Sequence, residues 1–165
     1  MIEKQGLVFP DLIYFDDFAG NFQDYFNAVY SVFKNDFIKS QPLYEGLKVS
    51  AQKLPEVEGI HRTFYHITHE GEDEQNREPD IRRMERIRFP KFVIDNNTDD
   101  QILVWENTRG KDTRVLLFSD TAGYIVILTK RQGYYLFWTA YLVTQQHRKN
   151  KLIQEYETYI KAKTA

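Results

Sequence analysis

Apolar residues between positions 21 and 37 recur at every third or fourth place. The series consists of Phe22, Tyr25, Phe26, Val29, Tyr30, Phe33 and Phe37. This spacing places all of them on one side of a helix, whose other side is polar. We therefore predict an amphipathic helix near the N-terminus, within a helical part of about residues 1–45.

The second half of the chain has a different pattern, with four short runs that are rich in β-branched and aromatic residues. They cover residues 102–106, 114–118, 124–129 and 134–143, and turns of hairpin length separate them. Such short connections favour up-and-down antiparallel order. The last two runs are apolar at both odd and even positions, so we expect them to be the central strands of the sheet.

The two faces of the last run follow from strand alternation. One face is predicted to carry Tyr135, Phe137, Thr139 and Tyr141, and the other Leu136, Trp138, Ala140 and Leu142. The second set is entirely apolar, so we predict that it faces the core.

The remaining segments alternate between short apolar pieces and polar breaks. We predict strands at 47–51 and 60–68, and an exposed loop at 69–78, which has no apolar residue. A helix is expected to begin at Pro79 and to end or kink at Pro90, because proline suits a first helical turn and not a helix interior.

A last helix is predicted over 145–161, with Leu152, Ile153, Tyr156, Tyr159 and Ile160 on its buried side. The predicted fold is α+β in a single domain, 1–165. N-terminal and C-terminal helices pack on a mainly antiparallel, meander-type sheet.

Composition narrows the functional classes. The chain has no cysteine, which excludes disulfides, thiolate zinc sites and cysteine nucleophiles. No apolar run reaches membrane-spanning length and the first residues do not resemble a signal peptide, so we expect a cytoplasmic protein without a membrane partner. Residues 1–100 carry 12 basic and 19 acidic side chains, whereas residues 101–165 carry 10 and 5. The basic C-terminal part could contact a polyanion, or it could simply face water.

Histidine is the natural candidate for acid–base chemistry, because its pKa lies near neutrality. Three of the four histidines are close in sequence, at His61, His66 and His69. A metal site built from His66, His69, Glu70, Glu72, Asp73 and Glu74 is an alternative, but the spacing fits no known ligand pattern. We predict neither a metal nor another cofactor.

The sequence has no motif for a phosphate-binding loop, a nucleophile elbow or a dinucleotide-binding site. What remains is a set of arginines between Arg77 and Arg88, whose planar guanidinium groups suit polyanions. They precede the strand that carries Thr139 and Tyr141.

The order of these features resembles a known superfamily. A histidine-bearing segment, Tyr-His-Ile-Thr at 65–68, precedes a polar loop, an arginine-bearing helix and a meander that ends in Trp-Thr-Ala-Tyr at 138–141. This order is similar to the phage and polymorphic-toxin branches of the barnase/EndoU/colicin/RelE-like ribonucleases, and the resemblance covers about residues 60–160.

The resemblance implies metal-independent endoribonuclease activity, in which the ribose 2′-hydroxyl attacks the adjacent phosphate. His66 would be the general base or acid, Thr139 and Tyr141 would orient the phosphate, and Arg82 or Arg83 would stabilise the developing charge, with Arg83 assigned to catalysis and Arg82 to substrate binding. His147 and Arg148 would be further phosphate contacts. RNA would be the partner, with a protein inhibitor as a second one.

Two other functions also suit these features. The same aromatic and arginine surface suits a non-catalytic, phage-associated module that binds a protein, because interface cores favour these residues. A sugar- or nucleotide-binding module that stacks its ligand on tyrosine is the other.

Overall fold

The computed structural model describes residues 6–73 and 76–164. The helices are η1 (Phe15–Phe18), α1 (Phe22–Lys34), the π-helix η2 (Asn35–Lys39), α2 (Arg62–Thr68), α3 (Ile81–Glu85), α4 (Phe89–Asp95) and α5 (Gln146–Thr164). The strands are β1 (Leu43–Tyr44), β2 (Leu47–Ala51), β3 (His69–Glu70), β4 (Glu78–Pro79), β5 (Ile102–Arg109), β6 (Asp112–Ser119), β7 (Tyr124–Arg131) and β8 (Tyr134–Leu142). No helix in the described ranges is both long and apolar enough to cross a membrane.

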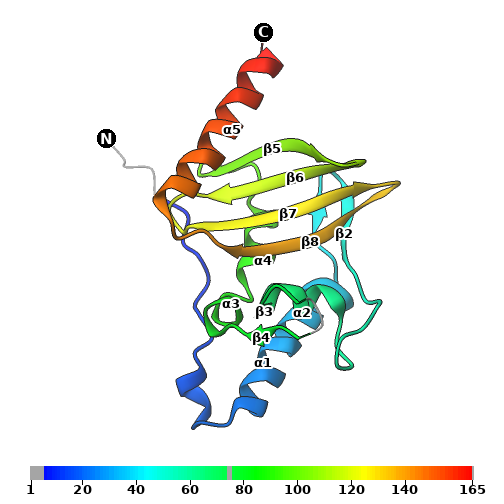
Figure 1. Cartoon of the computed structure of the whole chain (residues 1–165), viewed down its shortest axis with the longest axis vertical. Helices are drawn as coiled ribbons and strands as arrows, with labels where there is room; N and C mark the ends of the chain where they lie inside the picture. The colour runs from blue at the N-terminus through cyan, green and yellow to red at the C-terminus, as the bar shows by residue number, and fades with distance from the viewer. Residues whose placement is uncertain (1–5, 74–75, 165) are drawn as a thin grey trace.

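Six strands form the main sheet, in the order β1-β2-β8-β7-β6-β5 (Figure 1). Strands β5 to β8 are the predicted antiparallel meander, and β8 and β7 occupy the centre of the six-stranded sheet as predicted. Strand β2 joins β8 in parallel, which the sequence did not indicate. The α+β fold class, with terminal helices around a mainly antiparallel sheet, is thus confirmed.

The sheet has two apolar faces of unequal size. The larger core lies between one face and the helices α1, α2, α3 and α4, and its sheet residues include Val115, Leu117, Val126, Leu128 and Phe137. The second face carries Trp105, Leu116, Phe118, Ile125 and Ile127, which pack against half-buried residues of α5. In Figure 1, α5 lies near β5 and projects beyond the sheet, while α2, α3 and the β3–β4 pair lie below β8. Part of the second face is therefore not covered by α5.

The predicted strand at 60–68 is wrong, because residues 62–68 form helix α2. Phe64, Ile67 and Thr68 are buried there, at spacings of three and four that a helix places on one side. The β-branched and aromatic residues of this segment favoured a strand, and packing on β8 overrides that preference. His66 and Phe64 are two residues apart in a helix, or about 200° around its axis, so they do not share a face.

The predicted helix from Pro79 is two helices instead. Pro79 pairs with His69 in the β3–β4 ladder, and the side chain of Asp80 caps α3 by accepting hydrogen bonds from the backbone N–H groups of Arg82 and Arg83. Pro90 does not end a helix but lies in the first turn of α4, where proline is well tolerated. The part of the predicted loop at 74–75 lies outside the described residues.

Candidate functional site

A cleft of about 390 Å³ opens on the second face of the sheet, in the part that α5 leaves uncovered. Its lining residues come from α2, α3, the meander and the segment before β4. They are His66, Arg77, Arg83, Arg109, Arg114, Ile127, Trp138, Thr139 and Tyr141. The cleft thus brings together four residues predicted to be catalytic, His66, Arg83, Thr139 and Tyr141, from elements up to 75 positions apart in sequence.

A bulge in β8 decides which side chains reach this cleft. Thr139 pairs with Ile127, whereas the next pair along the ladder is Phe137 with Leu128, so Trp138 is the extra residue. The bulge reverses the alternation: Phe137 points into the larger core, while Thr139 and Tyr141 stay on the cleft face. β-Bulges commonly redirect side chains next to active sites.

The prediction that Trp138 faces the core is therefore wrong. Trp138 is 37% exposed and lines the cleft, and the neighbouring Thr139 is 7% exposed. Phe137, assigned to the opposite set, is fully buried and lies against Phe37, with ring centroids 4.7 Å apart. Strict alternation failed because the sequence does not reveal where a strand gains an extra residue.

Helix α2 directs His66 out of the core and into the cleft. The His66 ring lies 5.9 Å from that of Trp138, and its Nδ1 is 3.1 Å from Nη1 of Arg77. A guanidinium can only donate hydrogen bonds, so Nδ1 is the acceptor and the proton of the neutral ring lies on Nε2. In this arrangement His66 can donate a hydrogen bond from Nε2 to an anion.

Arg83 is held in place by its surroundings. Its Nη1 donates to the backbone carbonyl groups of His66 and His69, at 3.4 Å and 3.2 Å, and its Nε lies 3.4 Å from a carboxylate oxygen of Asp80. The same Asp80 caps α3. These contacts link the helix that carries Arg83 to the helix that carries His66.

Arg109 and Arg114 come from the two sides of the β5–β6 hairpin. Arg114 lies opposite Asn107 in the ladder, and its Nε donates to Oδ1 of Asn107 at 3.0 Å. Asn107 in turn donates to a carboxylate oxygen of Glu155 in α5, at 2.7 Å. The hairpin register therefore places both guanidinium groups on the cleft face.

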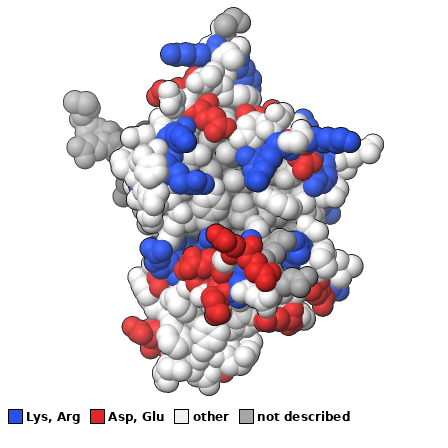
Figure 2. Space-filling model, viewed as in Figure 1, with Lys and Arg blue, Asp and Glu red and all other residues white. Residues whose placement is uncertain are grey.

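The electrostatic character of the cleft is strongly positive. Among the described residues that line it, four are arginines and none is Asp or Glu. In Figure 2, Lys and Arg side chains flank the middle of the same face, and Asp and Glu side chains gather below it. The acidic residues Glu70, Glu72 and Asp73, considered above as metal ligands, are exposed and do not line the cleft.

A second hollow continues from the cleft towards α5. It shares Arg109, Arg114, Ile127 and Tyr141 with the cleft and adds Arg148 and Lys151 from α5. Nη2 of Arg148 donates to the hydroxyl oxygen of Tyr141 at 3.2 Å, which leaves the hydroxyl proton of Tyr141 free to point to a ligand. Arg148 therefore lies at the edge of the cleft, where it contacts Tyr141.

Two other predicted residues do not reach the cleft. Arg82 is exposed on α3 beside Arg83, and His147 is exposed at the start of α5; neither lines the cleft or the adjoining hollow. Their neighbours Arg83 and Arg148 do, because successive helical residues point about 100° apart.

The other two histidines of the cluster are structural. His69 is only 4% exposed, stacks on Tyr65 at 4.3 Å and lies within 2.9 Å of the Thr68 hydroxyl. Burial lowers its pKa. His61 packs near Phe33, and burial lowers its pKa as well. Of these three, only His66 lines the cleft.

The predicted alternative of a metal site finds no support in the described residues. No three His, Cys, Asp or Glu side chains within 6–73 and 76–164 are arranged so that they could hold a metal ion. Glu74, one of the residues considered for that site, lies outside these ranges.

Sequence reasoning missed three arginines and the orientation of one tryptophan. Arg109 and Arg114 could have been found from the hairpin, because a two-residue turn at Gly110 and Lys111 sets the pairing and puts both on one face. Arg77 was only part of a general arginine set, and no local pattern links it to His66.

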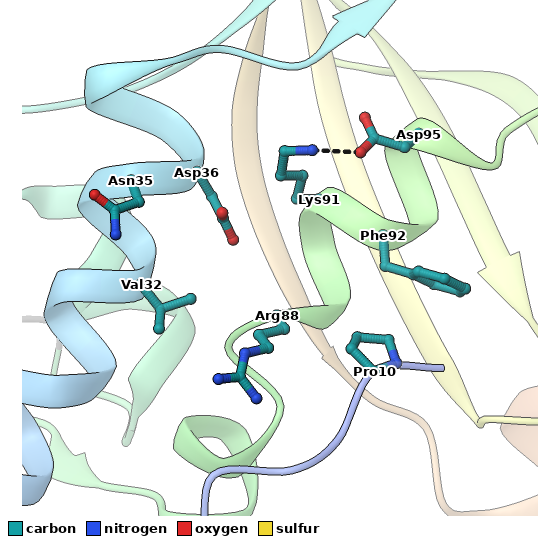
Figure 3. Close-up of a pocket in the computed structure, with 8 residues that line it drawn as sticks. All are labelled: Pro10, Val32, Asn35, Asp36, Arg88, Lys91, Phe92 and Asp95. Carbon is teal, nitrogen blue, oxygen red and sulfur yellow. Dashed lines mark hydrogen bonds and ion pairs between the residues drawn. The ribbon is translucent and has the colours of Figure 1, made fainter. Parts of the chain in front are cut away.

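A separate cavity of about 360 Å³ lies between the end of α1, the π-helix and α4 (Figure 3). Asp36 points into it, and Lys91 is paired with Asp95. Burial, with a smaller effect of Asp95, raises the pKa of Asp36. The cavity mixes both signs of charge and contains none of the residues predicted to be catalytic or to bind substrate.

Comparison with known proteins adds no assignment: no family model matches the chain, and no curated protein or solved structure shows significant similarity to it.

Proposed function

We propose that the cleft binds a phosphodiester of RNA and cleaves it without a metal ion. The observation that carries this proposal is the convergence of His66, Thr139, Tyr141 and Arg83 in one open cleft whose described lining has four guanidinium groups and no carboxylate. Preorganised guanidinium groups both attract a phosphate and stabilise the negative charge that develops on it during transfer.

The reaction would follow the chemistry implied by the ribonuclease resemblance. A base removes the proton of the ribose 2′-hydroxyl, the 2′-oxygen bonds to phosphorus, the bond from phosphorus to the 5′-oxygen breaks, and that oxygen receives a proton. Arg83, Arg109 and Arg114 bind the phosphate oxygens in this scheme. The hydroxyl groups of Thr139 and Tyr141 orient them.

His66 is the general acid or base of the proposed reaction. Its contact with Arg77 determines which nitrogen of the imidazole ring carries the proton. While Arg77 donates to Nδ1, Nε2 carries the ring proton and cannot accept another one. When a phosphate draws the Arg77 guanidinium away, the proton can shift to Nδ1, and Nε2 becomes the base. Substrate binding would thus activate the histidine.

The second candidate is a module that binds its partner in the same cleft without cleaving it. The Arg77–His66 contact favours this alternative, because it holds His66 as a hydrogen-bond donor. A protein with an acidic surface is the other partner that the four arginines suit.

Cleavage assays on the full chain distinguish these candidates. End-labelled RNA should be cleaved equally with and without EDTA, and should resist cleavage when the ribose 2′-hydroxyl is replaced by hydrogen. His66→Ala should slow the reaction roughly a hundred- to ten-thousand-fold, the usual contribution of a general acid or base. His147→Ala is the matched control, because His147 is exposed outside the cleft and should keep full activity.

Binding measured in parallel completes the test. RNA that binds but stays intact would support the non-catalytic candidate, and cleavage that needs a divalent ion would overturn the proposed mechanism. An active His66→Ala protein with a normal melting temperature would remove His66 from the reaction.

A further inference from the structure

Trp138 is an exposed indole placed where a strand residue would normally be either buried or paired. It is the extra residue of the β8 bulge, it is 37% exposed, and it lines the arginine cleft beside the His66 ring. Trp105, the other tryptophan, is almost fully buried under α5. The bulge thus exposes one large aromatic side chain at the site where the phosphate would bind.

The chemistry of the surroundings indicates what this indole contacts. A phosphate of a nucleic acid carries a sugar and a base, and the flat face of a base stacks well on an aromatic ring. The indole lies within the cleft and not on an apolar patch, so an anionic ligand with a planar group suits it better than a purely apolar one.

We propose that Trp138 stacks on an unpaired base of the nucleotide whose phosphate the cleft arginines hold. This inference rests on the proposed function, since it assumes that the anion is a nucleic-acid phosphate. Stacking on Trp138 requires an open base face, which only an unpaired nucleotide or a strand end offers. The cleft therefore selects single strands over duplexes.

The adjoining hollow can hold the next part of the same nucleic-acid strand. Trp138 and Tyr141 are three residues apart on β8, or about 10 Å at the usual strand rise. Beyond Tyr141 the hollow offers Arg148 and Lys151 to a further phosphate. A single strand can thus run along β8, with a base on Trp138 and its backbone continuing towards α5.

The experiment measures binding of a single-stranded 2′-O-methyl RNA, which the proposed reaction cannot cleave. The comparison set is its duplex, an oligonucleotide of equal length and charge without bases, and the corresponding DNA single strand. Trp138→Leu should weaken binding of the single strand roughly five- to hundredfold, the range that loss of one stacked base gives. The DNA strand should bind and respond similarly, because stacking does not read the 2′ position.

Tyr134→Leu is the matched control. Tyr134 is 38% exposed, lies on the same strand and is not part of the cleft lining, so its replacement should leave binding unchanged. Trp138→Phe should keep most of the affinity. For the baseless oligonucleotide, wild type and Trp138→Leu should bind equally weakly.

The outcomes separate this inference from the proposed function. If the oligonucleotides bind and Trp138→Leu has no effect, or the duplex or the baseless strand binds as tightly as the single strand, stacking is overturned and the phosphate site remains. If none of them binds wild type, both are overturned. If an acidic protein needs Trp138 for binding and nucleic acid does not, the cleft is a protein interface instead.

Discussion

The two faces of the meander differ in how completely they are buried. Towards α1 and α4, Val115, Leu117, Val126 and Leu128 are fully buried and form a continuous core. On the opposite face, apolar side chains persist where α5 covers the sheet, and beyond it the chain places Arg109, Arg114 and Thr139. The second face is thus a core where α5 packs on it, and it carries the polar and charged side chains of the cleft where α5 is absent.

Phe137 and Trp138 give the sharpest test of this contrast, because they are adjacent and belong to opposite faces. Phe137→Ala should lower the free energy of unfolding by about 3–5 kcal/mol, the usual cost of removing a buried phenyl ring. Trp138→Ala should cost much less, within about 1 kcal/mol, since the indole is exposed in the cleft. Urea denaturation of both variants measures the difference, and equal losses would mean that the cleft face is packed as tightly as the core.

The sequence was informative where one local rule governs the structure. The periodic apolar residues of α1, the turns of the meander and the two-sided apolar character of β7 and β8 predicted the antiparallel sheet and its centre. In α2 and β8 the rules competed. The β-branched and aromatic residues of 62–68 suit a strand, but contacts with distant β8 make them helical, and the extra residue Trp138 cannot be recognised without its partner strand.

The candidate site was predicted in the same uneven way. His66, Thr139 and Tyr141 do meet in one cleft, although the secondary structure assigned to His66 and the core face assigned to β8 were both wrong. The bulge reverses the alternation between Phe137 and Thr139, so Thr139 and Tyr141 remain on the cleft face. Arg77 and His66 lie just outside the paired strands β3 and β4, whose pairing brings them together, and no local pattern reveals this pairing.

Arg83 and Arg82 test the cleft face with two adjacent side chains of one type. Arg83→Ala should weaken RNA binding by about 1–2 kcal/mol, because it removes a charged donor from the cleft. The plot of the logarithm of the binding constant against the logarithm of salt concentration should also become less steep, by roughly the contribution of one phosphate contact. Titrations at several salt concentrations measure both effects.

Arg82→Ala serves as the control, since Arg82 is exposed outside the cleft and should leave affinity and salt dependence unchanged. Arg83→Lys should recover part of the binding by keeping the charge. If Arg82 and Arg83 contribute equally, the RNA contacts the surface of α3 in general and the cleft has no special role.

The smallest expected effect concerns His69, which lies in the buried part of the molecule. Burial lowers the pKa of His69 below its ordinary value of about 6.5, so between the folded and the unfolded pKa the unfolded chain binds more protons. The stability associated with neutral His69 is therefore fully present above about pH 6.5 and is lost as the pH falls.

His69→Gln should reduce the loss of unfolding free energy between pH 7.5 and pH 5.5, measured by urea denaturation at each pH, even if it lowers stability at both. His61, whose pKa burial also lowers, retains part of the dependence in that variant. An undiminished difference in His69→Gln would mean that His69 does not stay neutral in the folded protein, and that His61 or the carboxylates dominate the pH dependence.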